Sequence, residues 1–259
     1  MCRWLNIPRS SYYYQAVDPV SEVALEDKIT YIFLESKSRY GARKIKKCLE
    51  KDGIILSRRR IRRIMKRLNL VSVYQKAAFK PHSRGKNEAP IPNRLDRQFD
   101  QKRPLEALVT DLTYVRVDRR WAYVCLTIDF FNREIIGLTV GWHKTAELVK
   151  QAIQSIPYAL TKAKLFHSDR GKEFDNQLID EMLEAFGITR SLSQAGCPYD
   201  NAVAESTYRS FKLEFINQET FQSLKELALK TKDYVHWWNY HRIHGSLNYQ
   251  TPMTKRIIA

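Results

Sequence analysis

The first third of the chain repeats apolar residues at intervals of three and four, which is the spacing of amphipathic helices. Three such stripes follow one another, and Gly53 interrupts the pattern between the second and the third. Ser57 precedes the third stripe and is a residue that favours the N-terminal cap of a helix. The stripes consist of Leu25, Ile29, Ile32 and Phe33, of Ala42, Ile45, Cys48 and Leu49, and of Ile61, Ile64, Met65 and Leu68. We therefore predict a helical region over residues 1–71, whose last two helices form a helix-turn-helix.

The pattern changes beyond this region. Residues 72–104 show no sustained periodicity and contain four prolines, so we expect a linker there. Farther along, short apolar runs over 108–117 and 121–129 flank a polar DRR turn, which predicts a β-hairpin. The elements expected after the hairpin are a strand over 133–140, a helix over 145–163, a strand over 163–169, a helix over 176–186, a strand over 189–192 and a helix over 201–218.

This order of elements indicates the fold class. Three antiparallel strands followed by alternating helices and strands predict a mixed α/β sheet covered by helices, over residues 105–218. A further apolar stripe through Leu224, Leu227 and Trp238 predicts a C-terminal helix. Residues 219–259 are therefore expected to add this helix and a closing segment to the core. The whole chain is predicted to be an α/β protein that is preceded by an all-α region.

The net charge of the chain is +16, and almost all of it lies in the N-terminal part. Residues 1–104 carry 25 basic and 10 acidic side chains, whereas residues 105–212 carry 13 and 14. A basic arm on a neutral body is typical of a protein that binds a polyanion, most simply DNA. The alternative is an ordinary three-helix bundle with a solvated, charged exterior. The residues of the third helix that we expect to contact DNA are Arg58, Arg59, Arg62, Arg63 and Lys66.

The composition argues against several classes of protein. A hydrophobic content of 44% and an aromatic content of 12% are too high for a wholly disordered chain. No apolar run approaches the roughly 18–20 residues that span a bilayer, and the first residues lack the apolar stretch of a signal peptide. The four cysteines are scattered without a CxxC pair, which argues against a disulfide framework and a structural zinc site. We expect a cytoplasmic protein without a membrane partner.

Three acidic residues lie at unusual places in the predicted core. Asp111 interrupts the first strand, where a charge is unfavourable unless it is paired, hydrogen-bonded or bound to a metal. Asp169 ends the fourth strand, and Glu205 lies in the first turns of the long helix. Convergent carboxylates repel one another unless a divalent cation neutralises them, and an all-oxygen ligand set favours Mg²⁺ or Mn²⁺. Each residue also has an ordinary interpretation, as a bulge, a turn former or a charge favoured by the helix dipole.

Several segments match the motifs of one protein family. They are RYGARKIKKCLEKDGIILSRRRIRRIMKRLNL (39–70), TDLTYV (110–115), HSDRGKEF (167–174), PYDNAVAES (198–206) and WWNYHRIHGSLNYQTP (237–252). Between Asp169 and Glu205 there are 35 residues, the interval of that family. In these segments the chain resembles the DDE transposases and retroviral integrases, and more narrowly the OrfB transposase of the IS-three family of bacterial insertion sequences. The resemblance implies a ribonuclease-H-like catalytic core.

The resemblance also implies roles for single residues. It makes Asp111, Asp169 and Glu205 a catalytic triad that holds two Mg²⁺ ions, with Mn²⁺ as a substitute. Arg209 and Lys212 share a helical face with Glu205, and the resemblance assigns Lys212 a contact with DNA. For Arg209, a solvated charge is an equal alternative.

One segment departs from the family pattern. The family commonly has a basic residue, glycine and asparagine just before PYDN, whereas residues 195–197 of this chain are Ala, Gly and Cys. This departure concerns local DNA contacts and leaves the three carboxylates in place.

The implied activity is metal-dependent cleavage at the 3′ ends of an insertion sequence and transfer of those ends to target DNA. The implied partner is double-stranded DNA, both the terminal repeats of the element and the target. The resemblance further implies a homo-oligomer on DNA, and an upstream OrfA protein that acts separately or as a frameshift fusion. The alternatives are an inactive DNA-binding regulator derived from a transposase and a ribonuclease-H-like nuclease. The intact triad argues against the first, and the basic helix-turn-helix argues against the second.

Overall fold

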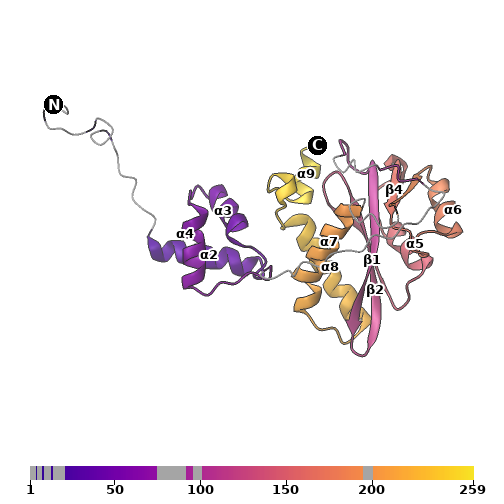
Figure 1. Cartoon of the computed structure of the whole chain (residues 1–259), viewed down its shortest axis with the longest axis horizontal. Helices are drawn as coiled ribbons and strands as arrows, with labels where there is room; N and C mark the ends of the chain where they lie inside the picture. Colours follow the sequence, from indigo (N-terminus) through magenta and orange to yellow (C-terminus); the bar gives the residue numbers. More distant parts are fainter. Residues whose placement is uncertain are drawn as a thin grey trace. The chain divides into compact units, whose positions relative to one another are not determined.

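The computed structural model describes residues 21–74, 92–95, 101–194 and 201–259, together with Trp4, Pro8 and Tyr13. The chain divides into two compact units, residues 1–72 and 73–259 (Figure 1). Most of the linker predicted over 72–104 lies outside the described residues.

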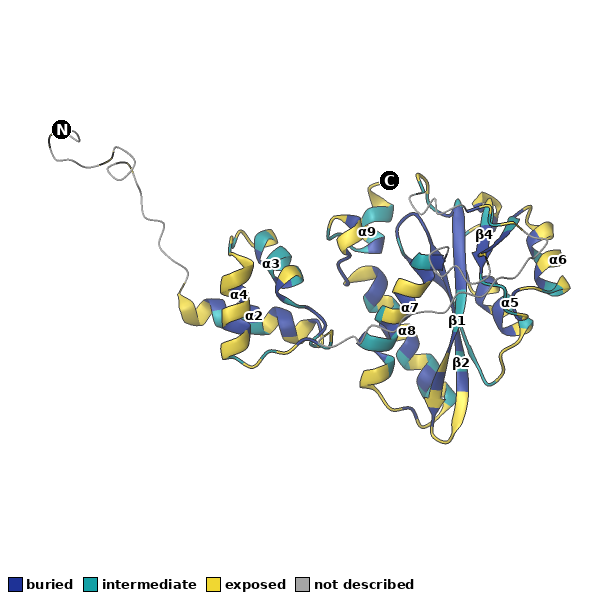
Figure 2. Ribbon diagram, in the orientation of Figure 1, coloured by how far each residue is buried: buried dark blue, intermediate teal, exposed yellow. Residues whose placement is uncertain are grey.

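The described part of the first unit contains the helices α2 (Glu22–Glu35), α3 (Ala42–Lys51) and α4 (Arg58–Arg67). Ser57 caps α4, since its hydroxyl accepts a hydrogen bond from the N–H of Arg60 at 3.2 Å. Gly53, between α3 and α4, has a φ of 76°, a value that favours glycine. The predicted apolar stripes form the buried core of this unit, except that Cys48 and Leu68 are only half-buried (Figure 2). The structure therefore confirms the helices that periodicity predicts.

The second unit is built on one mixed sheet with the strand order β3-β2-β1-β4-β5. Its strands are β1 (Ala107–Val117), β2 (Arg120–Asp129), β3 (Ile135–Gly141), β4 (Leu165–Ser168) and β5 (Thr189–Leu192). β1, β2 and β3 pair in antiparallel fashion, whereas β4 is parallel to β1 and β5 is parallel to β4. This arrangement confirms the predicted mixed α/β class and is consistent with a ribonuclease-H-like core.

Helices cover both faces of this sheet, with α7 and α8 on one side of β1 and α5 on the other (Figure 1). The helices are α5 (Ala146–Gln154), α6 (Gln177–Ala185), α7 (Ala202–Glu214), α8 (Leu224–Tyr240) and α9 (Pro252–Ile257), with short 3₁₀ turns η1 (Leu160–Lys162), η3 (Ile216–Gln218) and η4 (Gly245–Leu247). The helix predicted over 145–163 is too long, because Pro157 cannot continue α5. The helix predicted over 201–218 likewise ends early, at Glu214.

Two hydrophobic clusters hold the helices against the sheet. Val109, Val115 and Val117 of β1 pack into the cluster that contains residues of α7 and α8. Leu108 and Leu112 belong to the cluster on the α5 and α6 side. Because side chains alternate along a strand, the odd-numbered residues of β1, Asp111 included, project on the face that α7 covers. In the part of the chain that the structure describes, no helix is both long and apolar enough to cross a membrane.

Candidate active site

Two of the predicted carboxylates, Asp111 and Asp169, lie near the point where β1 and β4 cease to pair. β1 and β4 pair only as far as Val109, which lies beside His167. Beyond this pair β1 continues beside β2, whereas β4 ends at Ser168. Extending the same register by two residues brings Asp111 level with Asp169. Residues that lie far apart in the sequence are thus brought together at one edge of β1.

Asp111 lies near the centre of β1, opposite Leu126 of β2. Its side chain is partly buried, and its Oδ1 atom accepts a hydrogen bond from the N–H of Leu112 at 2.7 Å. Burial raises the pKa of Asp111 to about 7, and the neighbouring charge of Asp169 adds to this rise. Glu205 acts in the same direction, so both predicted partners repel the charge of Asp111. A site of this kind favours the uptake of positive charge, either a proton or a cation.

Asp169 follows β4 directly and begins a tight turn. Its Oδ1 atom accepts a hydrogen bond from the N–H of Gly171 at 2.9 Å. Burial raises the pKa of Asp169, and the charge of Glu173 adds to this rise, whereas the Gly171 N–H and Lys144 lower it. The Asp169 carboxylate therefore lies in the same electrostatic environment as Asp111.

Glu173 is a fourth carboxylate at this site, and the sequence pattern does not single it out. It is buried and forms an ion pair with Lys144 at 2.7 Å. A β-carbon on Gly171 would lie 2.3 Å from the Oε1 atom of Glu173, so the glycine leaves room for the carboxylate. The only available signal is its position four residues after Asp169 in HSDRGKEF, since an acid in a turn is ordinarily solvated.

Tyr208 holds α7 against the sheet at the level of Asp111. Its hydroxyl accepts a hydrogen bond from the N–H of Leu126 at 2.7 Å and donates one to the backbone carbonyl of Asp111. Because Leu126 and Asp111 face each other, the hydroxyl is inserted into the hydrogen-bond ladder between β1 and β2. Glu205 lies one turn before Tyr208 on the same helix. One buried tyrosine thus ties the helix that carries Glu205 to the strand that carries Asp111.

In the structure, Asp169 and Glu205 are near enough to Asp111 for their charges to act on it, but the three carboxylates do not form a metal-binding arrangement. The side chain of Glu205 is exposed, although its charge acts on Asp111. Within the described ranges, no group of three or more His, Cys, Asp or Glu side chains is arranged to hold a metal ion. The departure from the family at residues 195–197 lies outside the described residues. The donor set itself fits a hard cation, because Asp111 and Asp169 present carboxylate oxygens that repel each other.

Of the two basic residues predicted to contact DNA from α7, Lys212 lies beside β1 and Arg209 is exposed. The Lys212 ammonium lies 5.0 Å from the centre of the Tyr114 ring. Tyr114 is 59% exposed and meets Trp121 edge to face at 5.1 Å, and Arg116 lies over Trp121. Lys212 therefore extends an exposed surface of aromatic and cationic side chains, a composition that suits nucleic acid.

The cations of α4 fall into two groups. Arg60 and Arg67 form ion pairs with Glu22 of α2, and Arg67 also pairs with Glu26. The five residues predicted to contact DNA are all exposed and have no acidic partner among the described side chains: Arg58, Arg59, Arg62, Arg63 and Lys66. One side of α4 is thus tied to α2, while the rest remains available to an anion.

Known proteins share these sequence features. The chain matches a family model described as an HTH-like domain over residues 21–78, and models described as an integrase core domain over 101–198 and 186–252. It is 29% identical to the transposase for insertion sequence element IS904 of Lactococcus lactis, over 90% of this chain and 93% of that protein. It is 28% identical to the transposase InsF for insertion sequence IS3A of Escherichia coli, over 96% and 91%. A solved structure of the HTLV-2 integrase catalytic core with magnesium covers 60% of this chain and 97% of its own, with a TM-score of 0.45 and 15% identity.

Proposed function

We propose that this chain cleaves the 3′ ends of an insertion sequence and joins them to target DNA. The chain belongs to the integrase-core family, together with the transposases of IS-three-type insertion sequences. One observation supports this proposal: the charges of Asp169 and Glu205 both act on Asp111, near the point where β1 and β4 cease to pair. Similarity to named transposases over nine-tenths or more of the chain supports it.

The three carboxylates would hold the divalent metal, Mg²⁺ or Mn²⁺. When bound, the metal would supply activation of the attacking oxygen, from water in cleavage or from a DNA 3′-hydroxyl in joining, and stabilisation of the leaving 3′ oxygen. Asp111 would supply oxygen ligands from β1, Asp169 from the turn that follows β4, and Glu205 from α7. Tyr208 keeps the helix and the strand in register, as its hydroxyl bridges Leu126 and Asp111. The contribution of the protein to the reaction would thus be to position the three carboxylates.

The cations of the chain would bind the DNA. We assign Lys212 and Arg209 to phosphates near the reacting bond, because both lie on the helix of Glu205. The exposed cations of α4 would bind the backbone of the terminal repeat. We further propose that the chain acts as a homo-oligomer on DNA, with an upstream OrfA protein or fused to it.

The test is a comparison of two conservative variants in the full chain. Asp169→Asn removes one charge at the site, and Asp233→Asn removes one on the exposed surface of α8. We expect Asp169→Asn to lose Mg²⁺-dependent cleavage and strand transfer while it still binds the ends of the element. Asp233→Asn should keep all three properties. Strand transfer by Asp169→Asn at the rate of the unmodified protein would refute the proposed site.

The same experiment separates the alternative functions. An unmodified chain that binds element ends but neither cleaves nor joins them with Mg²⁺ or Mn²⁺ would be a regulator. A chain that degrades nucleic acid without preference for the element ends would be a nuclease.

A further inference from the structure

An ion pair joins the segment between β3 and α5 to the turn that follows β4. Lys144, in the first of these segments, places its ammonium 2.7 Å from the Oε1 atom of Glu173, in the second. The side chain of Glu173 is 5% exposed, whereas that of Lys144 is 48% exposed. The carboxylate is thus fixed inside the protein, and the ammonium reaches it from the surface.

The acidic member of this pair, Glu173, belongs to the same turn as Asp169. The N–H of Gly171 donates a hydrogen bond to the Oδ1 atom of Asp169 at 2.9 Å. A β-carbon on the same glycine would lie 2.3 Å from the Oε1 atom of Glu173, which is also the atom that pairs with Lys144. Both carboxylates therefore lie against one small residue, and the turn brings the Lys144 ammonium close to Asp169.

The charge of Lys144 acts on the carboxylates of the candidate active site. It lowers the pKa of Asp169, against the rise that burial causes. In return, the hydrogen bond with Glu173 raises the pKa of Lys144, and the charges of Asp169 and Asp111 add to this rise. One ammonium therefore lies in the electric field of three carboxylates.

The start of α5 holds the backbone of Lys144 in place. The next residue, Thr145, caps this helix, since its hydroxyl accepts a hydrogen bond from the N–H of Leu148 at 3.4 Å. Leu148 and Val149 are buried in the hydrophobic cluster on the α5 and α6 side of the sheet. The Lys144 side chain thus extends toward Glu173 from a point that is anchored to the core.

We propose that Lys144 weakens the binding of the divalent metal at Asp111 and Asp169, and thereby sets the Mg²⁺ concentration at which the site fills. The inference rests on the proposed function, since it takes these carboxylates to be metal ligands. A divalent cation and an ammonium in the field of the same carboxylates repel each other, and this repulsion opposes metal binding. Glu173 has the opposite effect, because its negative charge acts on the same two carboxylates and attracts a cation.

A purely structural role of the ion pair predicts a different pattern of effects. If Lys144 and Glu173 only held the turn that carries Asp169, the removal of either partner would displace Asp169 and weaken metal binding. If their charges act on the metal, removal of the lysine strengthens metal binding and removal of the glutamate weakens it. The sign of the change in affinity therefore separates the two roles.

The test measures the binding of Mn²⁺ and Mg²⁺ to the full chain without DNA, by isothermal titration calorimetry at fixed ionic strength. We expect Lys144→Met to lower the Kd of the metal roughly threefold to tenfold, and Glu173→Gln to raise it by a similar factor. Lys144→Arg keeps the charge and should bind the metal as the unmodified protein does. Lys150→Met is the matched control, because it removes a lysine of α5 that pairs with Glu147 at 3.5 Å. It should leave the Kd unchanged.

A double variant keeps the test decisive if Lys144→Met folds poorly. Lys144→Met deprives the buried carboxylate of Glu173 of this ion pair, which destabilises the fold. Lys144→Met combined with Glu173→Gln removes the carboxylate and its partner together. The Kd of the double variant should be close to that of the unmodified protein, since one positive and one negative charge are lost. A double variant that binds the metal as weakly as Glu173→Gln alone would show a structural role and overturn the proposal.

The outcomes distinguish a failure of this inference from a failure of the proposed function. If the unmodified chain binds Mn²⁺ and Lys144→Met binds it no more tightly, the inference is wrong and the proposed function stands. If the unmodified chain and Lys144→Met bind neither Mn²⁺ nor Mg²⁺, the proposed function fails together with the inference.

Discussion

Tyr208→Phe is the substitution that most directly probes how the carboxylates are held. It removes one hydroxyl and leaves the ring, which packs against Phe211 at 6.3 Å, in place. The hydroxyl accepts from the Leu126 N–H and donates to the Asp111 carbonyl, so two backbone groups lose their partner together. Leu126 is fully buried, and solvent cannot replace the lost bond.

The magnitude follows from how far these two groups can recover. A buried polar group without a partner costs about 1–3 kcal/mol. Because Leu126 and Asp111 face each other across the strands, their backbone groups can pair directly once the hydroxyl is gone. We therefore expect the free energy of unfolding to fall by about 1–2 kcal/mol in total. For a unit of this size, Tm should fall by roughly 2–8 °C.

We expect the cleavage rate of Tyr208→Phe to fall more strongly than its free energy of unfolding. If β1 and β2 close on each other, α7 loses this hydrogen-bonded link to β1, and we expect Glu205 to shift relative to Asp111. A misplacement of about 1 Å at a reacting centre costs up to roughly a hundredfold in rate. We expect the Mg²⁺-dependent cleavage rate to fall roughly tenfold to a hundredfold, measured well below the Tm of the variant.

Tyr234→Phe is the matched control. Tyr234 is also buried, and its hydroxyl donates to the Oε2 atom of Glu214 at 2.8 Å, away from the carboxylates of the site. It should lose a similar amount of stability and keep cleavage near the rate of the unmodified protein. Equal losses of cleavage in the two variants would refute a positioning role for Tyr208.

Three further predictions follow from the structure. Because the pKa of Asp111 is about 7 in the folded protein and near 4 in an unfolded chain, the free energy of unfolding without metal should fall as pH rises between these values. Asp111→Asn should flatten that part of a pH series of urea unfolding curves, and an unchanged series would contradict the shift. Replacing Arg58, Arg59 and Arg62 of α4 by alanine should flatten the salt dependence of DNA binding. The control Arg60→Ala, which breaks an ion pair with Glu22 of α2, should change the salt dependence less. Arg242→Met should lower the free energy of unfolding by about 3 kcal/mol in denaturant titration, since it leaves the buried carboxylate of Glu214 without its ion-pair partner at 2.8 Å, and a loss near zero would contradict this.

The periodicity of apolar residues in the sequence was sufficient to predict the helices and strands and the mixed α/β class of the sheet. The stripe of α4 and its cap at Ser57 depend on residues next to one another in the chain, and both are confirmed. The position of Asp111 within a strand is likewise visible as a charge between Val109 and Leu112. Helix ends were predicted less well, since α5 and α7 are each followed by a separate 3₁₀ turn, η1 and η3, that the prediction merged with the helix.

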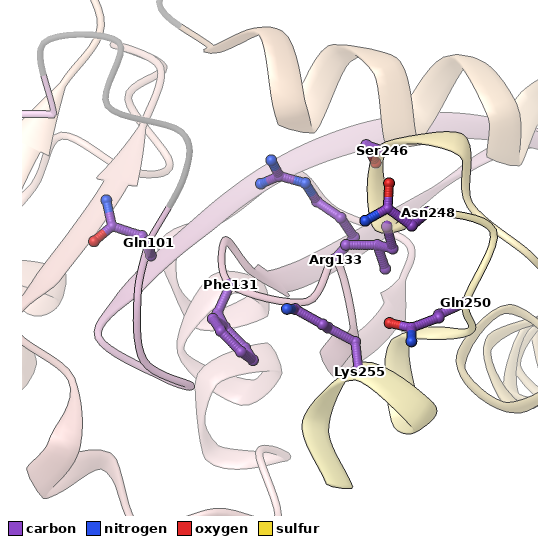
Figure 3. Close-up of a pocket in the computed structure, with 8 residues that line it drawn as sticks. Gln101, Phe131, Arg133, Ser246, Asn248, Gln250 and Lys255 are labelled. Atoms are coloured by element: carbon purple, nitrogen blue, oxygen red, sulfur yellow. The ribbon is translucent and has the colours of Figure 1, made fainter. Parts of the chain in front are cut away.

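The features that depend on pairing between distant segments could not be predicted. Glu173 looks like a solvated turn residue until Gly171 lets it fold inward against Lys144. Tyr208 occupies a position on the apolar stripe of α7, and only the strand register shows that its hydroxyl enters the ladder at Asp111. A polar cavity of about 220 Å³ is lined by Arg133 together with residues more than a hundred positions farther along the chain (Figure 3). In each case the arrangement comes from a neighbour that no local pattern identifies.

The measurement that tests the central claim most directly is the rate of 3′-end cleavage across a Mg²⁺ titration, for the unmodified chain and for three single variants. The variants are Asp111→Asn, Asp169→Asn and Glu205→Gln. If the carboxylates act as one metal-holding set, each variant should fail to cleave at every Mg²⁺ concentration while it binds the element end as the unmodified chain does. Cleavage by any one of them at the rate of the unmodified chain would contradict the account.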